Sequence, residues 1–159
     1  MLSKDPDEAA KYYVDSHMKI ILEIGLMMST AVWYVTGQQH PRDFRTSSGL
    51  YKPTHINHPV SKWVHASQEN FLWASELAHV LNREKQYRWP HRLPHASIAC
   101  VEKALSYRDL FPSCGLTPFA LAMPEEYKTE DPVESYRDFY RYGKAHLHKW
   151  TRREPPSWL

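Results

Sequence analysis

Glycine is scarce in this sequence, with five residues among 159, whereas proline occurs twelve times, tryptophan six times and tyrosine ten times. So few glycines, together with few runs that alternate apolar and polar residues, favour helices joined by proline-rich loops over strands joined by tight turns. Cysteine is also rare. Cys100 and Cys114 form neither a metal-binding pattern nor a disulfide framework, which fits a reducing compartment.

Targeting segments and common nucleotide-binding motifs are missing as well. The first ten residues are polar and acidic, so we expect no signal peptide, and we expect no apolar run long enough to cross a membrane. We therefore expect a cytosolic protein that does not bind a membrane. The sequence contains no GxxxxGK[ST] loop, no GxGxxG turn and no GxSxG elbow, which argues against a classical nucleotide-binding fold.

The length and the composition, 42% apolar and 24% charged residues, predict one globular domain over residues 1–159. The most apolar stretch, residues 15–36, is predicted to form one helix of about six turns. Apolar side chains cover almost every side of this helix, and such a helix is usually buried. The predicted fold class is therefore all-α, with four to five helices packed around a central helix at about 15–36 and long ordered proline-rich loops.

Start and stop signals delimit the expected helices. Asp5 and Asp131 each precede a proline, which is the pattern of a capping residue followed by the first helical position. Gly37 is expected to end the central helix. The other helices are expected at about residues 6–14, 59–85, 95–107 and 133–148.

The segment 38–59 is predicted to be a long loop, because it contains two X-Pro steps before Pro59 and a Ser-Ser-Gly turn. It carries Arg42, Arg45, Asn57 and His58. Long ordered loops in compact domains are often functional, so phosphate contacts, a substrate lid and an ordinary surface loop all stay open for this segment.

One narrow polar seam interrupts the apolar surface of the central helix. Ser16, Lys19, Glu23 and Thr30 fall within a band roughly 80° wide at the helical period. Lys19 and Glu23 are one turn apart, so they can form an ion pair, or an amine and a carboxylate that transfer protons or form a Schiff base. A purely structural ion pair is the alternative. His17 lies about 160° away around the helix axis, so it faces a different wall.

Histidine spacing gives only a weak metal signal. His55 and His58 are three residues apart, and His91 and His95 are four apart, but Pro94 interrupts the second pair and neither is an HExxH helix. We therefore expect no metal and no cofactor.

Charge is unevenly distributed toward the end of the chain. Acidic residues dominate 125–138 and basic residues dominate 141–153, and the segments FYRYGK and KWTRR alternate rings with cations. Such a basic aromatic tail, at about 146–159, suits a nucleic acid, because rings stack on unpaired bases and cations neutralise phosphates. A solvated charged surface is the alternative. The residues expected to hold phosphates are Arg137, Arg141, Lys144, Lys149, Arg152 and Arg153.

The Asp15-Ser16-His17 opening, Glu23 and the segment 140–145 resemble the phage pyrimidine-dimer DNA glycosylases of the endonuclease V type. The resemblance covers the layout of most of the chain and is specific only in these patches. It implies an all-helical enzyme whose N-terminal α-amine attacks the sugar of a damaged nucleotide, with Glu23 as the catalytic glutamate and His17 as a DNA-contacting histidine.

This sequence departs from that family in two respects. Glu23 lies six residues after His17 rather than seven, and the arginines that flank the glutamate in the family are absent. Leu2 is too large for efficient removal of Met1, so the free amine would be that of methionine, and Lys19 is the alternative amine. Asp15, His17, Lys19 and Glu23, with the NHP of 57–59, are also similar to uncharacterised small phage proteins.

The leading hypothesis is a DNA-acting enzyme that works on an extruded pyrimidine or its glycosidic bond, or that modifies a base of phage DNA. Its catalytic residues would be Glu23, Lys19 and His17. A non-catalytic DNA-binding or host-interaction protein and an enzyme acting on a free nucleotide are the rival hypotheses. The residues expected to complete the substrate pocket are His58, Asn57, Asn70 and Thr30.

Overall fold

The computed structural model describes residues 1–37 and 49–159, which contain six α-helices and no β-strand. The all-α prediction is therefore confirmed for these ranges. Residues 38–48 of the predicted loop, with Arg42 and Arg45, lie outside the described residues. The helices are α1 (Pro6–Tyr12), α2 (Ile20–Thr36), α3 (Pro59–Ala66), α4 (Gln68–Arg88), α5 (Ser97–Leu105) and α6 (Pro132–Asp138).

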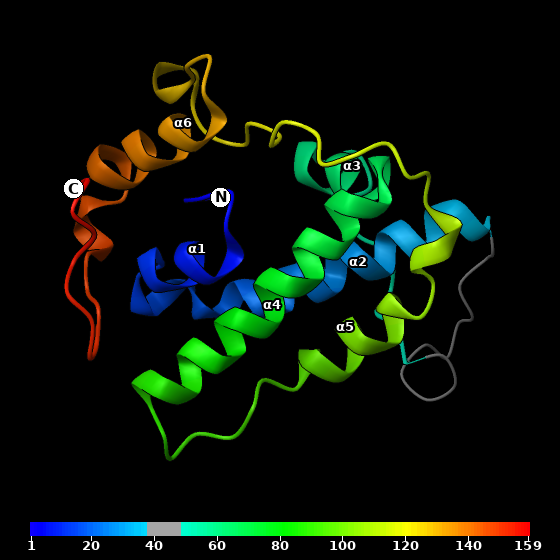
Figure 1. The fold of residues 1–159 in the computed structure, drawn as a ribbon, viewed down its shortest axis with the longest axis horizontal. Helices are drawn as coiled ribbons and strands as arrows, with labels where there is room; N and C mark the ends of the chain where they lie inside the picture. The colour runs from blue at the N-terminus through cyan, green and yellow to red at the C-terminus, as the bar shows by residue number, and fades with distance from the viewer. Residues whose placement is uncertain (38–48) are drawn as a thin grey trace.

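Two long helices hold the described part of the fold together. α2 packs against α3, α4 and α5, while α4 packs against α1, α2, α3 and α5 (Figure 1). The expectation of packing around the 15–36 helix alone is therefore not confirmed. Figure 1 also shows the first residues of the chain lying between α6 and α4, with the C-terminal tail descending beside α1.

The helix ends follow the local sequence signals closely. Asp5 accepts a hydrogen bond from the backbone N–H of Asp7 at 2.8 Å, and Asp131 accepts one from Val133 at 2.7 Å. These side-chain caps satisfy N–H groups that have no partner within the helix. Gly37 ends α2 with φ of 60°, in the left-handed region that favours glycine.

Three predicted helices are shorter or divided. Residues Asp15–Lys19 form a 3₁₀ turn before α2. The predicted 59–85 helix is split at Ser67, whose extended backbone lets its hydroxyl cap α4 at the N–H of Asn70 and donate to the Gly115 carbonyl. The predicted 133–148 helix ends at Asp138 and continues as a π-helical turn, Phe139–Gly143.

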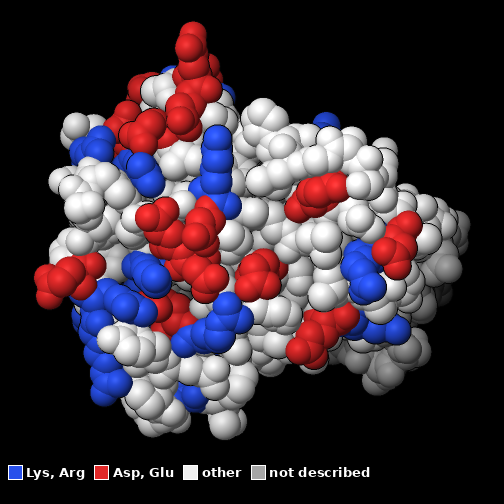
Figure 2. All heavy atoms as spheres, in the orientation of Figure 1, with Lys and Arg blue, Asp and Glu red and all other residues white. Residues whose placement is uncertain are grey.

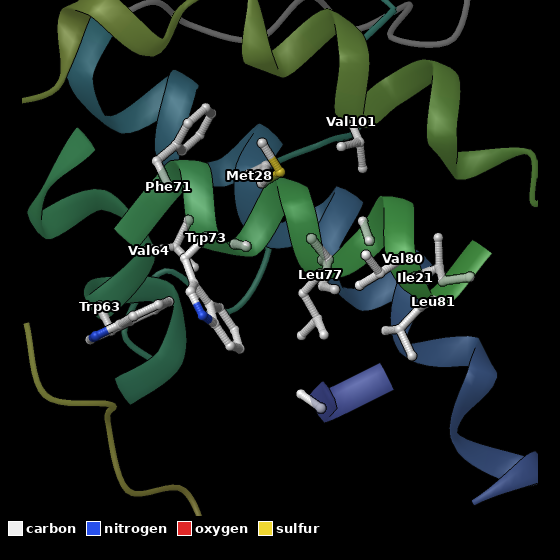
Figure 3. Close-up of a cluster of buried hydrophobic side chains, with 14 of the residues drawn as sticks. Ile21, Met28, Trp63, Val64, Phe71, Trp73, Leu77, Val80, Leu81 and Val101 are labelled. Carbon is white, nitrogen blue, oxygen red and sulfur yellow. The ribbon is translucent and has the colours of Figure 1, made fainter. Parts of the chain in front are cut away.

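The core contains a cluster of aromatic side chains where α3 meets α4. Trp63 and Trp73 pack edge to face with 5.8 Å between ring centroids, and Phe119 packs on both. Figure 3 shows Trp63, Trp73 and Leu77 projecting to the same side of the α3–α4 pair. Burial of such large rings is a main source of folding free energy. Trp63 and Trp73 also line the site described below.

One helical stretch of the described residues, Asp15–Thr36, is long and apolar enough to cross a membrane, with a mean hydropathy of 1.4. The expectation that no apolar run reaches that length is therefore wrong. In the fold, 56% of its most apolar window is buried inside the protein. A core helix of a soluble protein meets the same criteria.

A buried ionic network ties the N-terminal region to the end of α4. The Arg88 side chain is 0% exposed and donates to Glu84 at 2.8 Å, to Asp15 at 3.0 Å and to the carbonyls of Tyr13 and Lys11 at 2.9 and 3.0 Å. Bonds from Thr151 and Arg88 to Asp15, and from Arg153 and Arg88 to Glu84, hold the pKa of both carboxyl groups below their ordinary values despite partial burial, which opposes the shift. The sequence pattern gave no indication of this arginine.

We expect Arg88→Met to lower the free energy of unfolding by about 3–5 kcal/mol, because it removes the buried donor to the Tyr13 and Lys11 carbonyls and leaves Glu84 and Asp15 with only part of their bonds. Urea unfolding of the variant measures the loss. Arg83→Met on the same helix is the control, since Arg83 is 60% exposed in its ion pairs and exposed pairs contribute roughly 0–1 kcal/mol. Equal losses in the two variants would contradict a structural role for the network.

Candidate functional site

A cavity of about 270 Å³ opens where the N-terminus meets α2, α3 and α4. Its walls are mostly apolar and aromatic, with a few polar groups, as in most small-molecule sites. Burial raises the pKa of Tyr136 to about 12, and its hydroxyl donates to the Ala120 carbonyl at 2.8 Å. The residues that line the cavity include Met1, Tyr13, Glu23, His58, Trp63 and Trp73.

The N-terminal residue is held in this cavity by backbone contacts from two helices. Leu2 is fully buried, and its carbonyl accepts from Arg137 Nε on α6 at 3.1 Å. The Lys4 carbonyl accepts from Trp73 Nε1 on α4 at 2.7 Å. Because these bonds are made to the carbonyls on either side of Ser3, they hold the segment that follows Met1 in place.

Desolvation changes the chemistry of that amine. Burial lowers the pKa of the Met1 α-amine from 8.0 to about 4. An amine with such a pKa is neutral at physiological pH and therefore carries the lone pair that a nucleophile needs. Met1 lines the aromatic cavity, whereas Lys19 does not.

Glu23 lies on the cavity wall, as the resemblance implies, but its surroundings differ from the buried polar seam that was expected. It is exposed, and it also lines an adjoining outer groove of about 350 Å³. Lys19 is exposed on the preceding 3₁₀ turn, and no ion pair joins it to Glu23 in the described part of the chain. The change from a 3₁₀ turn to an α-helix at Ile20 alters the spacing on which their predicted pairing depends.

His17 is placed by a contact with the π-helical turn. Its Nδ1 is hydrogen-bonded to the Tyr140 hydroxyl, and the two rings pack edge to face at 5.3 Å. Burial lowers the pKa of His17 to about 4, and the nearby positive charges of Lys144 and Lys19 add to this shift. His17 does not line the cavity.

His58 lines both the cavity and the outer groove, whereas Asn57 is exposed and lines neither. His58 is also the N-cap of α3, where its Nδ1 accepts from the backbone N–H of Val60 at 3.2 Å. The cap fixes the ring at the cavity wall.

Two residues expected in the substrate pocket bind neighbouring backbone instead. Thr30 Oγ1 donates to the Thr54 carbonyl and accepts from the Thr54 N–H, which attaches the segment before α3 to α2. Asn70 is fully buried and bonds to Trp63 and to both the backbone and the side chain of Thr117. Neither lines the cavity, because their polar groups satisfy buried backbone groups.

Most of the predicted phosphate-binding arginines bond within the protein. Arg137 and Arg141 hold the Leu2 and Trp158 carbonyls. Arg152 donates to the Tyr87 carbonyl at 3.2 Å, and Arg153 makes a two-point ion pair with Glu84. Figure 2 shows basic side chains over the C-terminal tail at the lower left and acidic ones prominent above α6.

The predicted phosphate-binding lysines are not engaged in the same way as the arginines. Lys144, Lys149 and Lys19 make no ion pair within the described ranges. Lys144 and Lys19 both lie close enough to His17 for their charges to lower its pKa. The proposed contacts of these lysines with phosphate stay predictions.

The sequence did not predict the aromatic lining of the cavity. Only the resemblance to the glycosylase family pointed to the N-terminal amine as a functional group. The apolar spacing marks Trp63 and Trp73 as core residues, and nothing local indicates that the core is hollow beside them. Among residues 1–37 and 49–159, no three His, Cys, Asp or Glu side chains gather as they would around a metal ion.

No protein-family model, no curated protein and no solved structure matches this chain.

Proposed function

We propose that the protein is an enzyme acting on an extruded pyrimidine nucleotide of DNA, with the α-amine of Met1 as the nucleophile and Glu23 as the proton acceptor. One observation supports this proposal above the others: a desolvated amine and a carboxylate share the wall of an aromatic cavity. The aromatic rings suit a flat base, and a base must leave the stack before its glycosidic bond becomes accessible.

The chemistry needs only these two groups for its covalent step. The amine lone pair forms a bond to the sugar C1′ while the C1′–N1 bond breaks and its electron pair leaves with the base. Glu23 accepts the proton that the attacking nitrogen loses. The resulting aminal opens to an imine as the C1′–O4′ bond breaks and the ring oxygen takes up a proton.

Lys144 and Lys19 favour a phosphate-bearing substrate, because they bring positive charge near His17 and make no ion pair in the described residues. Binding through such contacts weakens as salt is added. A second candidate is an enzyme that takes a free nucleotide into the same cavity. The arginines that bond within the protein favour it, because they leave few cations available to bind the phosphates of a duplex.

Borohydride trapping on a duplex with one abasic site tests the proposal and separates the two candidates. We expect a covalent protein–DNA adduct whose yield falls as salt is raised, and full trapping by Lys19→Ala. Trapping of free 2-deoxyribose 5-phosphate with equal efficiency would favour the free-nucleotide enzyme. Absence of any adduct would contradict imine chemistry.

The pH dependence of trapping gives a separate prediction from the lowered pKa of Met1. Because that pKa is about 4, the amine stays neutral between pH 6 and pH 8, and single-turnover trapping should not slow as pH falls across this range. An amine with a pKa of 8.0 would lose roughly tenfold in rate for each pH unit below 8. Methionine amide trapped on the same duplex supplies that reference, and a matching decline for the protein would show that the amine is not desolvated.

A further inference from the structure

His58 has a hydrogen-bonding arrangement that the proposed reaction leaves unexplained. Its backbone N–H donates to the His55 carbonyl at 2.8 Å, and its own carbonyl accepts from Lys62 at 3.0 Å. Its ring Nδ1 accepts from the Val60 N–H. Backbone and ring are therefore both fixed, and Nε2 is left without a hydrogen-bond partner among the described residues.

The cap on α3 also determines where the imidazole proton lies. A backbone N–H can donate only to a ring nitrogen that carries a lone pair, so Nδ1 is unprotonated. In the neutral ring the proton must then be on Nε2. The ring that carries this donor lines both the cavity and the outer groove, as Glu23 does.

The turn before His58 is held in an unusual conformation at the rim of the groove. His55 has φ of 49°, a left-handed backbone that non-glycine residues rarely adopt, and its Nδ1 is hydrogen-bonded to the Thr54 hydroxyl at 2.8 Å. Thr54 is in turn bonded to Thr30 of α2. Local strain maintained by surrounding bonds is common beside functional groups, where it positions a side chain in advance.

We propose that His58 is a further catalytic residue whose Nε2–H forms a hydrogen bond to a carbonyl oxygen of the departing pyrimidine. This inference rests on the proposed function. When the C1′–N1 bond breaks, the electron pair spreads onto the carbonyl oxygens of the base, and a fixed donor stabilises that charge. The base leaves as the anion and takes its proton from water.

Two variants separate the donor from the cap. In His58→Asn the side-chain oxygen can occupy the place of Nδ1 and keep the cap, but nothing reaches the place of Nε2. In His58→Gln the amide N–H can reach the place of Nε2, while the cap is weakened. Each is assayed for borohydride trapping on an abasic duplex, and for base release from duplexes with one uracil, 5-hydroxymethyluracil or 5-fluorouracil.

We expect His58→Asn to slow base release about 10²–10³-fold more than it slows trapping of the abasic duplex, the usual cost of one lost donor at a developing anion. The loss should be smaller for 5-fluorouracil, a better leaving group, and His58→Gln should recover part of the rate with a lower unfolding midpoint. Unchanged base release, or equal slowing of release and abasic trapping, would overturn the role of His58. Release of no base by wild-type protein that still traps abasic DNA would also overturn it, whereas absence of trapping would overturn the proposed function itself.

Discussion

A version of the protein extended by one glycine before Met1 should lose abasic-site trapping by roughly 10²-fold or more. One added residue displaces the α-amine by about 3.5 Å, and displacements of even 1 Å from a productive geometry cost about that much in rate. Because Leu2 and Lys4 are held by Arg137 and Trp73, the rest of the segment should stay in place. Rates of borohydride trapping measure the effect.

The control for this variant uses the same molecule before and after cleavage. A protease-removable extension that leaves Met1 as the first residue should give an inactive protein that regains full trapping when cut. Circular dichroism should be unchanged by the cut. Full trapping by the uncut protein would show that the N-terminal amine is not the nucleophile.

The second large effect is expected at Glu23. Glu23→Gln removes the carboxylate that accepts the proton of the attacking amine, and loss of a positioned general base costs about 10²–10⁴-fold. Because Glu23 is exposed and makes no ion pair in the described residues, the substitution should leave the unfolding midpoint unchanged. Single-turnover trapping with saturating abasic duplex isolates the chemical step.

Glu102→Gln on α5 is the matched control, since Glu102 is also exposed but lies outside the cavity lining. It should trap DNA at the wild-type rate. If Glu23→Gln also keeps that rate, the carboxylate has no part in the reaction and the assignment of the cavity as the catalytic site loses its main support.

Local sequence patterns were enough to predict where two helices start and to select residues on one wall of the site. Asp-Pro pairs carry their own capping chemistry, so α1 and α6 begin where the sequence places them. Glu23 and His58 could be selected as candidates because a carboxylate on an apolar helix and a histidine before a helix-starting proline are locally unusual.

Contacts between distant segments explain what the sequence could not show. The break at Ser67 depends on a hydrogen bond to the Gly115 carbonyl, 48 residues away. The guanidinium groups of Arg137 and Arg153 are likewise held by distant partners, the Leu2 carbonyl and the Glu84 carboxylate. A basic aromatic pattern looks the same whether its cations face solvent or hold the chain's own carbonyls. The burial of the Met1 amine likewise arises only when α4 and α6 meet around it.

Mapping the trapped adduct tests the central role of Met1 most directly. Trypsin cleaves after Lys4 and Lys11, so an adduct on the α-amine would appear on the peptide of residues 1–4, MLSK. After borohydride trapping on abasic DNA and nuclease digestion, mass spectrometry should find the sugar-derived mass on that peptide. An adduct on a peptide that spans an uncleaved Lys19, residues 12–42, would show that the side-chain amine reacts and that Met1 does not.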